Sequence, residues 1–301
     1  MMFKKICIIG CGLIGSSIAR AVKKNNLSEK VVSSNRSAEI NKKVIELKIV
    51  DESSSETEKM VSNSDLTIIA TPLSSYESVI LKIKSSLKIG SIITDVGSVK
   101  GGILNLIKNH VPENVSWIPS HPIAGTEESG PEAGFSELFK NRWCILTPSK
   151  KAKEKDVNVL KVFWEKIGSK VDIMEAKKHD HILAITSHMP HLIAYNIVTT
   201  SLNIQDEKKS EIVKYSASGL RDFTRIAASN PIMWRDIFIQ NKKNTSELIN
   251  KFISNLVELK KAIENEDGKK LEEIFSKTKK IRKDILDAGQ DVNKPDFGRK
   301  Q

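Results

Sequence analysis

Cysteine, aromatic residues and long apolar runs are all scarce in this chain of 301 residues, and each scarcity excludes a class of protein. The chain has three cysteines, Cys7, Cys11 and Cys144. This small, odd number argues against a disulfide framework and favours a reducing compartment. No two of them have metal-ligand spacing. No apolar run approaches the length that spans a bilayer. We therefore predict a cytoplasmic protein with no bound metal and no membrane segment.

Aromatic residues make up 5% of the chain, and they do not alternate with basic residues as in proteins that bind single-stranded nucleic acid. The net charge is +11, from 48 lysines and arginines against 37 acidic residues. These lysines are scattered, however, and many fall in stretches that we interpret as solvated helix faces. The positive excess therefore favours anionic small molecules as ligands, and we expect no binding of nucleic acid.

The first half of the chain alternates strand and helix patterns in a regular way. Such alternation predicts βαβ units and a mainly parallel sheet of the Rossmann type, in which ligands bind beyond the carboxyl ends of the strands. The stretch DESSSETEK is predicted to be a polar loop. The predicted strands are FKKICIIG, KVVSSN, SDLTIIAT, GSIITDVG, VSWIPSH, WCILTP and KVDIM.

After about residue 176 the strand patterns stop, and apolar residues recur at helical spacing. Pro190 lies inside the first of these helices and is expected to kink or interrupt it. The final stretch QDVNKPDFGRKQ is expected to be a loose end. We therefore predict an α/β protein with a nucleotide-binding domain over residues 1–176 and an all-helical domain over residues 177–301.

The chain begins MMFKKICIIGCGLIG, which is basic and then apolar like a signal peptide, but its glycines fit a first strand and turn better. Gly10, Gly12 and Gly15 form the pattern G-x-G-x-x-G between the first strand and the first helix. They allow a tight turn, close approach of a pyrophosphate, and close packing of helix on strand. The helix N-terminus then faces the phosphates. The alternative is a glycine-rich turn without a ligand.

About twenty residues beyond this pattern, NAD-binding proteins carry an acidic residue that holds the ribose. This chain has SSNRS there instead. Asn35 and Arg36, flanked by hydroxyls, can receive a 2′-phosphate that a carboxylate would repel, which favours NADP over NAD. The alternative for Arg36 is stacking on the adenine. We assign to the cofactor site Gly10, Gly12, Leu13, Ile14, Gly15, Asn35, Arg36, Ser37, Thr71 and Pro72.

Further motifs follow the glycine pattern in order: DVGSVK, SHPIAGTEESG, SHMPH and SGLRDFTRIAASNPIMW. With them the chain resembles the prephenate/arogenate (cyclohexadienyl) dehydrogenase family from Lys4 to about Leu286. The resemblance implies a nucleotide-binding domain followed by a helical domain that holds substrate and forms a homodimer. It also implies oxidative decarboxylation of prephenate to 4-hydroxyphenylpyruvate, or of arogenate to tyrosine, in tyrosine biosynthesis. The sequence does not distinguish the two substrates.

The resemblance also implies roles for single residues. His121 of HPIAGT would be catalytic, and a histidine pKa of about 6.5 suits a general base. Ser98 of GSVK would lie beside the reacting hydroxyl. His191 and Arg225 would face the substrate, and the guanidinium of Arg225 would anchor a carboxylate.

Three weaker assignments complete the predicted substrate site. Thr126 and Glu127, in the loop after His121, would contact the substrate or gate its entry. Arg221 stands where relatives often have a lysine beside a glycine-rich run. Arginine and lysine differ in geometry, so this position bears on substrate preference.

Several of these side chains have structural alternatives. Ser98 can cap the helix that follows it, and Arg225 can form an interface salt bridge. Trp234 either packs or lines the pocket, and His188 belongs either to the site or to a helix interior. The histidines predicted to lie at the surface are His110, His179 and His181.

Two other functions compete with this interpretation. A β-hydroxyacid dehydrogenase would carry a catalytic lysine on the first helix of the second domain, where HILAITSHMPHLIAYN has none. A regulatory protein that binds NADP without turnover is disfavoured by His121, Ser98 and Arg225. We also expect neither a fused chorismate mutase before the glycine pattern nor an amino-acid-binding regulatory domain after the helices.

Overall fold

The computed structural model describes residues 1–202, 214–215 and 218–287. The chain forms two compact units, Met1–Thr245 and Ser246–Gln301. The domain boundary predicted between residues 176 and 177 stays a prediction. The final stretch that we expected to be loose, residues 290–301, lies outside the described residues.

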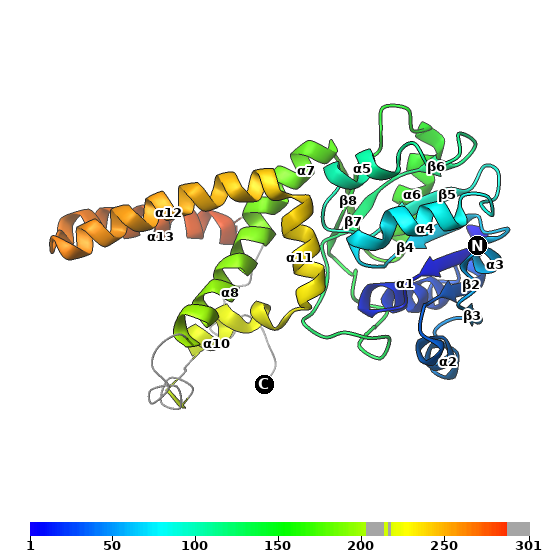
Figure 1. The fold of residues 1–301 in the computed structure, drawn as a ribbon, viewed down its shortest axis with the longest axis horizontal. Helices are drawn as coiled ribbons and strands as arrows, with labels where there is room; N and C mark the ends of the chain where they lie inside the picture. Colours follow the sequence, from blue (N-terminus) through cyan, green and yellow to red (C-terminus); the bar gives the residue numbers. More distant parts are fainter. Residues whose placement is uncertain (203–213, 216–217, 288–301) are drawn as a thin grey trace. The chain divides into compact units, whose positions relative to one another are not determined.

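A parallel sheet of six strands in the order β3-β2-β1-β4-β5-β6 forms the first half of the larger unit (Figure 1). This is the strand order of a Rossmann fold, which confirms the predicted fold class. Its topological switch point lies between β1 and β4, where such sheets bind dinucleotides. The strands are β1 (Phe3–Ile9), β2 (Ser28–Ser34), β3 (Glu52–Ser54), β4 (Leu66–Ile69), β5 (Ile92–Asp95) and β6 (Ser116–Trp117).

Helices cover both faces of this sheet, so alternate side chains of β1 enter two different cores. Ile6 and Ile8 pack with helices α1 and α6, whereas Cys7 and Ile9 pack with α3, α4 and α5. Burial on both faces explains the unbroken apolar run of this strand. The helices around the sheet are α1 (Leu13–Lys24), α2 (Ala38–Glu46), α3 (Thr57–Val61), α4 (Tyr76–Ile83), α5 (Gly101–Ile107) and α6 (Glu154–Lys166).

The polar loop predicted for DESSSETEK is wrong, because this stretch contains β3 and α3. β3 is a three-residue edge strand that pairs with β2 through its backbone. Its serines form hydrogen bonds to polar neighbours, as between the hydroxyls of Ser33 and Ser53 at 2.7 Å. An edge strand held in this way carries no apolar pattern that a sequence could reveal.

The strand predicted for VSWIPSH is divided between two sheets. Its first part is β6, and its second part is β7 (Ser120–Pro122), which pairs antiparallel with β8 (Trp143–Leu146). β8 pairs in turn with β9 (Lys170–Ile173). Pro119 separates the two parts and has no N–H with which to continue the first ladder. The second sheet therefore begins beside the carboxyl end of β5, where Ser120 and Thr94 hydroxyls lie 2.9 Å apart.

From Ala176 onward the described residues are helical, as predicted. Pro190 follows a π-helical segment, Ala184–His188, which interrupts the helix and confirms the expected effect of the proline. No described helix is long and apolar enough to cross a membrane. The α-helices are α7 (Ala176–Leu183), α8 (Met189–Leu202), α10 (Ser218–Thr224), α11 (Pro231–Gln240), α12 (Lys242–Glu264) and α13 (Gly268–Asp287).

Candidate active site

The glycine turn has the backbone geometry that its pattern predicts. Gly10 has a φ of +94°, which favours glycine, and a Cβ on Gly15 would lie 2.1 Å from the Gly10 carbonyl oxygen. A Cβ on Gly12 would meet nothing within 4 Å. The first and third glycines are therefore required by the chain itself. The space beside the second agrees with a ligand approaching there, and its cofactor role stays a prediction.

The residues after β2 divide into one buried side chain and two exposed ones. The Asn35 side chain is buried, and its Oδ1 accepts a hydrogen bond from the Cys11 amide at 2.6 Å. Ser37 caps α2 by accepting from the Ile40 amide at 3.3 Å. Arg36, between them, is exposed. Asn35 thus holds the glycine turn in place, and the contact of Arg36 with a ligand stays a prediction.

The other predicted cofactor residues flank the same turn. Thr71 follows β4, and its Cγ2 lies 2.9 Å from where a Cβ of Gly10 would stand. Its hydroxyl accepts from Ser75 at 2.8 Å, within a short 3₁₀ turn over Leu73–Ser75. Pro72 is exposed, and Leu13 and Ile14 are half-buried. The structure therefore brings Thr71 against the glycine turn.

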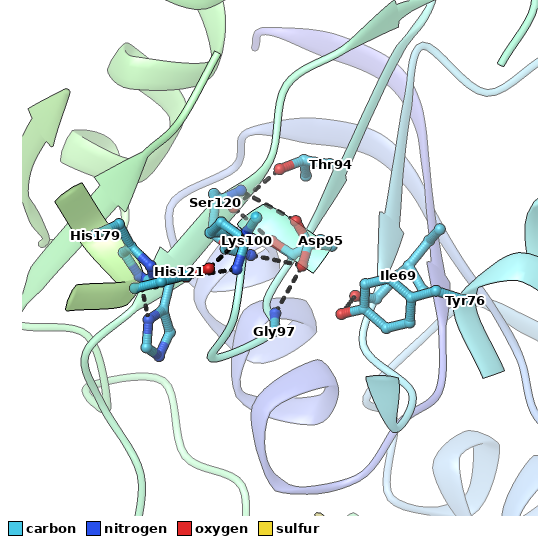
Figure 2. Close-up of polar contacts among 11 residues, drawn as sticks. Ile69, Tyr76, Thr94, Asp95, Gly97, Lys100, Ser120, His121 and His179 are labelled. Atoms are coloured by element: carbon cyan, nitrogen blue, oxygen red, sulfur yellow. Dashed lines mark hydrogen bonds and ion pairs between the residues drawn. The ribbon is translucent and has the colours of Figure 1, made fainter. Parts of the chain in front are cut away.

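A buried ion pair that the sequence did not suggest joins β5, α5 and β7 (Figure 2). Lys100 Nζ lies 2.6 Å from Asp95 Oδ2 and donates to the Ser120 carbonyl. The Ser120 hydroxyl donates to the Asp95 carbonyl. Burial lowers the pKa of Lys100, and Asp95 opposes that shift. The signal available in DVGSVK was an aspartate and a lysine on either side of a glycine turn.

His121 lies on β7, beside this ion pair, and is 7% exposed. Its Nδ1 is 2.8 Å from Nε2 of His179 on α7, and His179 Nδ1 is 2.9 Å from Asp180 Oδ1. Burial holds the pKa of His121 well below its ordinary value, and neighbouring His179 lowers it further. The lowered pKa departs from the value near 6.5 expected for a general base, and it favours the unprotonated imidazole.

The surface position predicted for His179 is wrong, because this residue is fully buried. It shares a face of α7 with the buried Leu183 four residues later, and that spacing was the signal we missed. His181 is exposed, as predicted, and His110 is partly exposed.

Asp180 binds the start of α5 with its carboxylate. Its Oδ1 accepts from the Lys100 amide at 2.8 Å, and its Oδ2 accepts from the Gly101 amide at 2.7 Å. These are the amides that Ser98 would have capped, so the capping alternative for Ser98 is wrong. Ser98 is half-buried in the turn between β5 and α5. Its place beside the reacting hydroxyl stays a prediction.

Residues from the helical part form a second group. The His191 ring stacks on Trp234 with centroids 3.7 Å apart, and its Nδ1 donates to the Ser187 carbonyl at 2.9 Å. Arg225 pairs with Glu127 at 2.9 Å. Burial lowers the pKa of His191, and the charge of Arg225 lowers it further. The structure thus brings together three predicted substrate residues. Trp234 is buried and packs against His191, and its place in the pocket stays a prediction.

The remaining predicted substrate residues are Thr126 and Arg221. Thr126 accepts from the Glu128 amide at 3.2 Å within its own turn. Arg221 is 75% exposed on α10, 3.6 Å from Asp222. Their substrate roles stay predictions.

His188 links the two groups. It is fully buried, which fits the helix-interior alternative, and its Nδ1 is 3.1 Å from the side-chain Nδ2 of Asn241. Its ring centroid is 6.1 Å from that of Trp234. Burial lowers its pKa to about 4. No described group of His, Cys, Asp and Glu side chains is arranged to hold a metal ion.

Two family models match the chain: prephenate dehydrogenase, nucleotide-binding domain, over residues 18–173, and prephenate dehydrogenase, dimerization domain, over residues 175–277. The cyclohexadienyl dehydrogenase of Zymomonas mobilis is 37% identical over 281 residues, which cover 93% of this chain and 96% of that protein. The prephenate dehydrogenase of Bacillus subtilis is 32% identical, over 92% of this chain and 75% of that protein. The crystal structure of prephenate dehydrogenase from A. aeolicus with hydroxyphenyl propionate and NAD+ matches with a TM-score of 0.87 and 32% identity, over 95% of this chain and 99% of that one.

Proposed function

Since this chain belongs to the prephenate dehydrogenase family, we propose that it catalyses the NAD(P)-dependent oxidative decarboxylation of prephenate, of arogenate, or of both, in tyrosine biosynthesis. The observation that carries the proposal is His121, a buried neutral imidazole beside the carboxyl end of β5. A β-hydroxyacid dehydrogenase is disfavoured, because the matching family models and relatives are prephenate and cyclohexadienyl dehydrogenases.

The proposed reaction needs a proton acceptor on the substrate hydroxyl. Hydride leaves the carbinol carbon while the hydroxyl proton passes to His121, and a carbonyl forms. Loss of CO₂ then returns its bonding electrons to the ring, which becomes aromatic, and the phenolic oxygen takes a proton back. A bound nicotinamide would supply the hydride acceptor. His121 thus takes up and returns one proton, a role typically worth about 10²- to 10⁴-fold in rate.

The residues around the glycine turn fit such a cofactor. The turn lies at the switch point of the sheet, with open space beside Gly12 and Thr71 at its edge. Arg36 is exposed just beyond β2, where the adenine ribose binds in this fold. An arginine there suits a 2′-phosphate, so we propose NADP as the preferred cofactor.

Substrate carboxylate would bind at the second group. Arg225 supplies the guanidinium, Glu127 holds it in position, and His191 keeps Nε2 as an acceptor because Nδ1 donates to a carbonyl. Ser98 would lie on the other side, next to the hydroxyl. We assign Thr126 and Arg221 to the edge of the same site.

We also propose a homodimer in the cytoplasm. The model that matches residues 175–277 is named for dimerization. Exposed apolar side chains on α12 and α13, such as Leu256 and Phe275, agree with a covered surface there.

A single assay tests the proposal. Purified protein is given prephenate or arogenate with NAD or NADP, and the absorbance of the reduced nicotinamide is followed at about 340 nm. We expect turnover with at least one substrate and faster turnover with NADP. Absence of turnover in all four combinations, from protein that binds nucleotide, would refute the function.

A further inference from the structure

Three side chains form a hydrogen-bonded line that ends on the proposed base: Asp180, His179 and His121. A histidine can act as a base only at a ring nitrogen that carries no proton, and which nitrogen that is depends on the partner of the other. The protons along this line can be placed from its donors and acceptors together with the burial of His179.

The Asp180 carboxylate accepts two hydrogen bonds from the backbone at the start of α5. The Lys100 amide donates to Oδ1 at 2.8 Å, and the Gly101 amide donates to Oδ2 at 2.7 Å. Backbone amides can only donate, so both carboxylate oxygens accept. His179 Nδ1, which is 2.9 Å from Oδ1, must therefore carry a proton and donate it to Asp180.

A neutral His179 with its proton on Nδ1 has a bare Nε2. The His179 ring is fully buried, and this burial lowers its pKa despite the opposing effect of Asp180, so the neutral ring is favoured. Its bare Nε2 lies 2.8 Å from His121 Nδ1, so His121 Nδ1 must donate. The two nitrogens of an imidazole point in nearly opposite directions, and His121 Nε2 is therefore bare and directed away from His179 (Figure 2).

We propose that His179 and Asp180 are positioning residues that fix this protonation pattern, so that His121 presents an unprotonated Nε2 to the substrate hydroxyl. The inference rests on the proposed function of His121. When His121 takes the proton, its Nδ1–H bond to His179 is kept, and no bond in the line has to reverse. The other groups whose charge acts on His121 are Lys100 and His188. If His179 carried a proton on both ring nitrogens, its Nε2 would donate to His121 Nδ1. The proton of a neutral His121 would then lie on its Nε2, which could not accept the substrate proton.

Nitrogen NMR of the full-length protein reads the pattern directly. With ¹⁵N-labelled histidine at about pH 7.5, we expect Nδ1 of His121 to appear protonated and Nε2 to appear bare, with signals assigned through His121→Asn. His179→Leu should abolish this fixed pattern. His181→Leu, which changes an exposed histidine on the same helix, should preserve it. A proton on His121 Nε2 in the unmodified protein would overturn the proposal.

Kinetics supply the second measurement. His179→Leu should lower kcat by about 100-fold or more, within the range of lost acid–base catalysis, with little change in KM or nucleotide affinity. His179→Gln, whose amide oxygen can accept from His121 Nδ1, should recover part of that loss. An unchanged kcat in His179→Leu would contradict the proposal. Full turnover by His121→Asn would instead refute the proposed function of His121. The two failures are distinguishable, because the NMR measurement of the protonation pattern needs no turnover.

Discussion

The two groups of side chains at the candidate site are held in different ways. The His121 cluster, made of His121, His179, Asp180, Asp95 and Lys100, is buried and bonded throughout. The Arg225 cluster, made of Arg225, Glu127, His191 and Trp234, includes an arginine side chain that is 41% exposed. A proton acceptor needs a fixed position, whereas a binding group must admit the substrate. The difference agrees with the proposed division of roles, in which the first cluster carries the chemistry and the second binds the substrate.

His121→Asn tests the chemical half of this comparison and should have the largest effect. Removing the base should lower kcat by about 10²- to 10⁴-fold, the range that positioned proton transfer typically contributes. Steady-state rates give kcat, and nucleotide titration, expected to be unchanged, gives the control for folding. Turnover near that of the unmodified protein would remove His121 from the mechanism.

Lys100→Met tests whether the His121 cluster depends on its buried ion pair. The change leaves Asp95 buried without its cation, which typically costs about 3–5 kcal/mol of unfolding free energy. Urea unfolding measures the loss. Lys161→Met, which breaks a surface pair with Glu165, should change stability by less than about 1 kcal/mol. Equal effects of the two substitutions would show that burial of the pair is not what stabilises the cluster.

Arg225→Gln tests the binding half. The glutamine keeps a polar side chain but loses the charge and the paired donors, so KM for the substrate should rise by about tenfold or more while kcat changes less. The partial exposure of Arg225 keeps this effect below that of a dry ion pair. Arg142→Gln, at an exposed arginine before β8, should leave KM as it is. A drop in kcat at constant KM would place Arg225 with the chemistry instead.

More of the Arg225 cluster than of the His121 cluster could be predicted from the sequence. The glycine turn could be predicted because its requirements are local: the φ of Gly10 and the closeness of Gly15 involve residues within one βα unit. His121, Arg225 and Glu127 were predicted through motifs. His179 was missed although its spacing to Leu183 on α7 is a signal of burial, because its partner His121 lies 58 residues away in the sequence. Lys100 was missed for the same reason, since its partners meet only where β5 and β7 come together.

Arg36→Ala extends the comparison to the cofactor and should have the smallest effect. Arg36 is exposed, like the Arg225 cluster, so it is expected to contribute affinity and no chemistry. Loss of a charge-assisted contact with a 2′-phosphate should raise KM for NADP by about tenfold and leave KM for NAD nearly unchanged. Lys42→Ala, on the exposed side of α2, controls for a general change in charge. If KM rises equally for both cofactors, Arg36 contacts the adenine rather than a phosphate, and binding at this edge does not distinguish NADP from NAD.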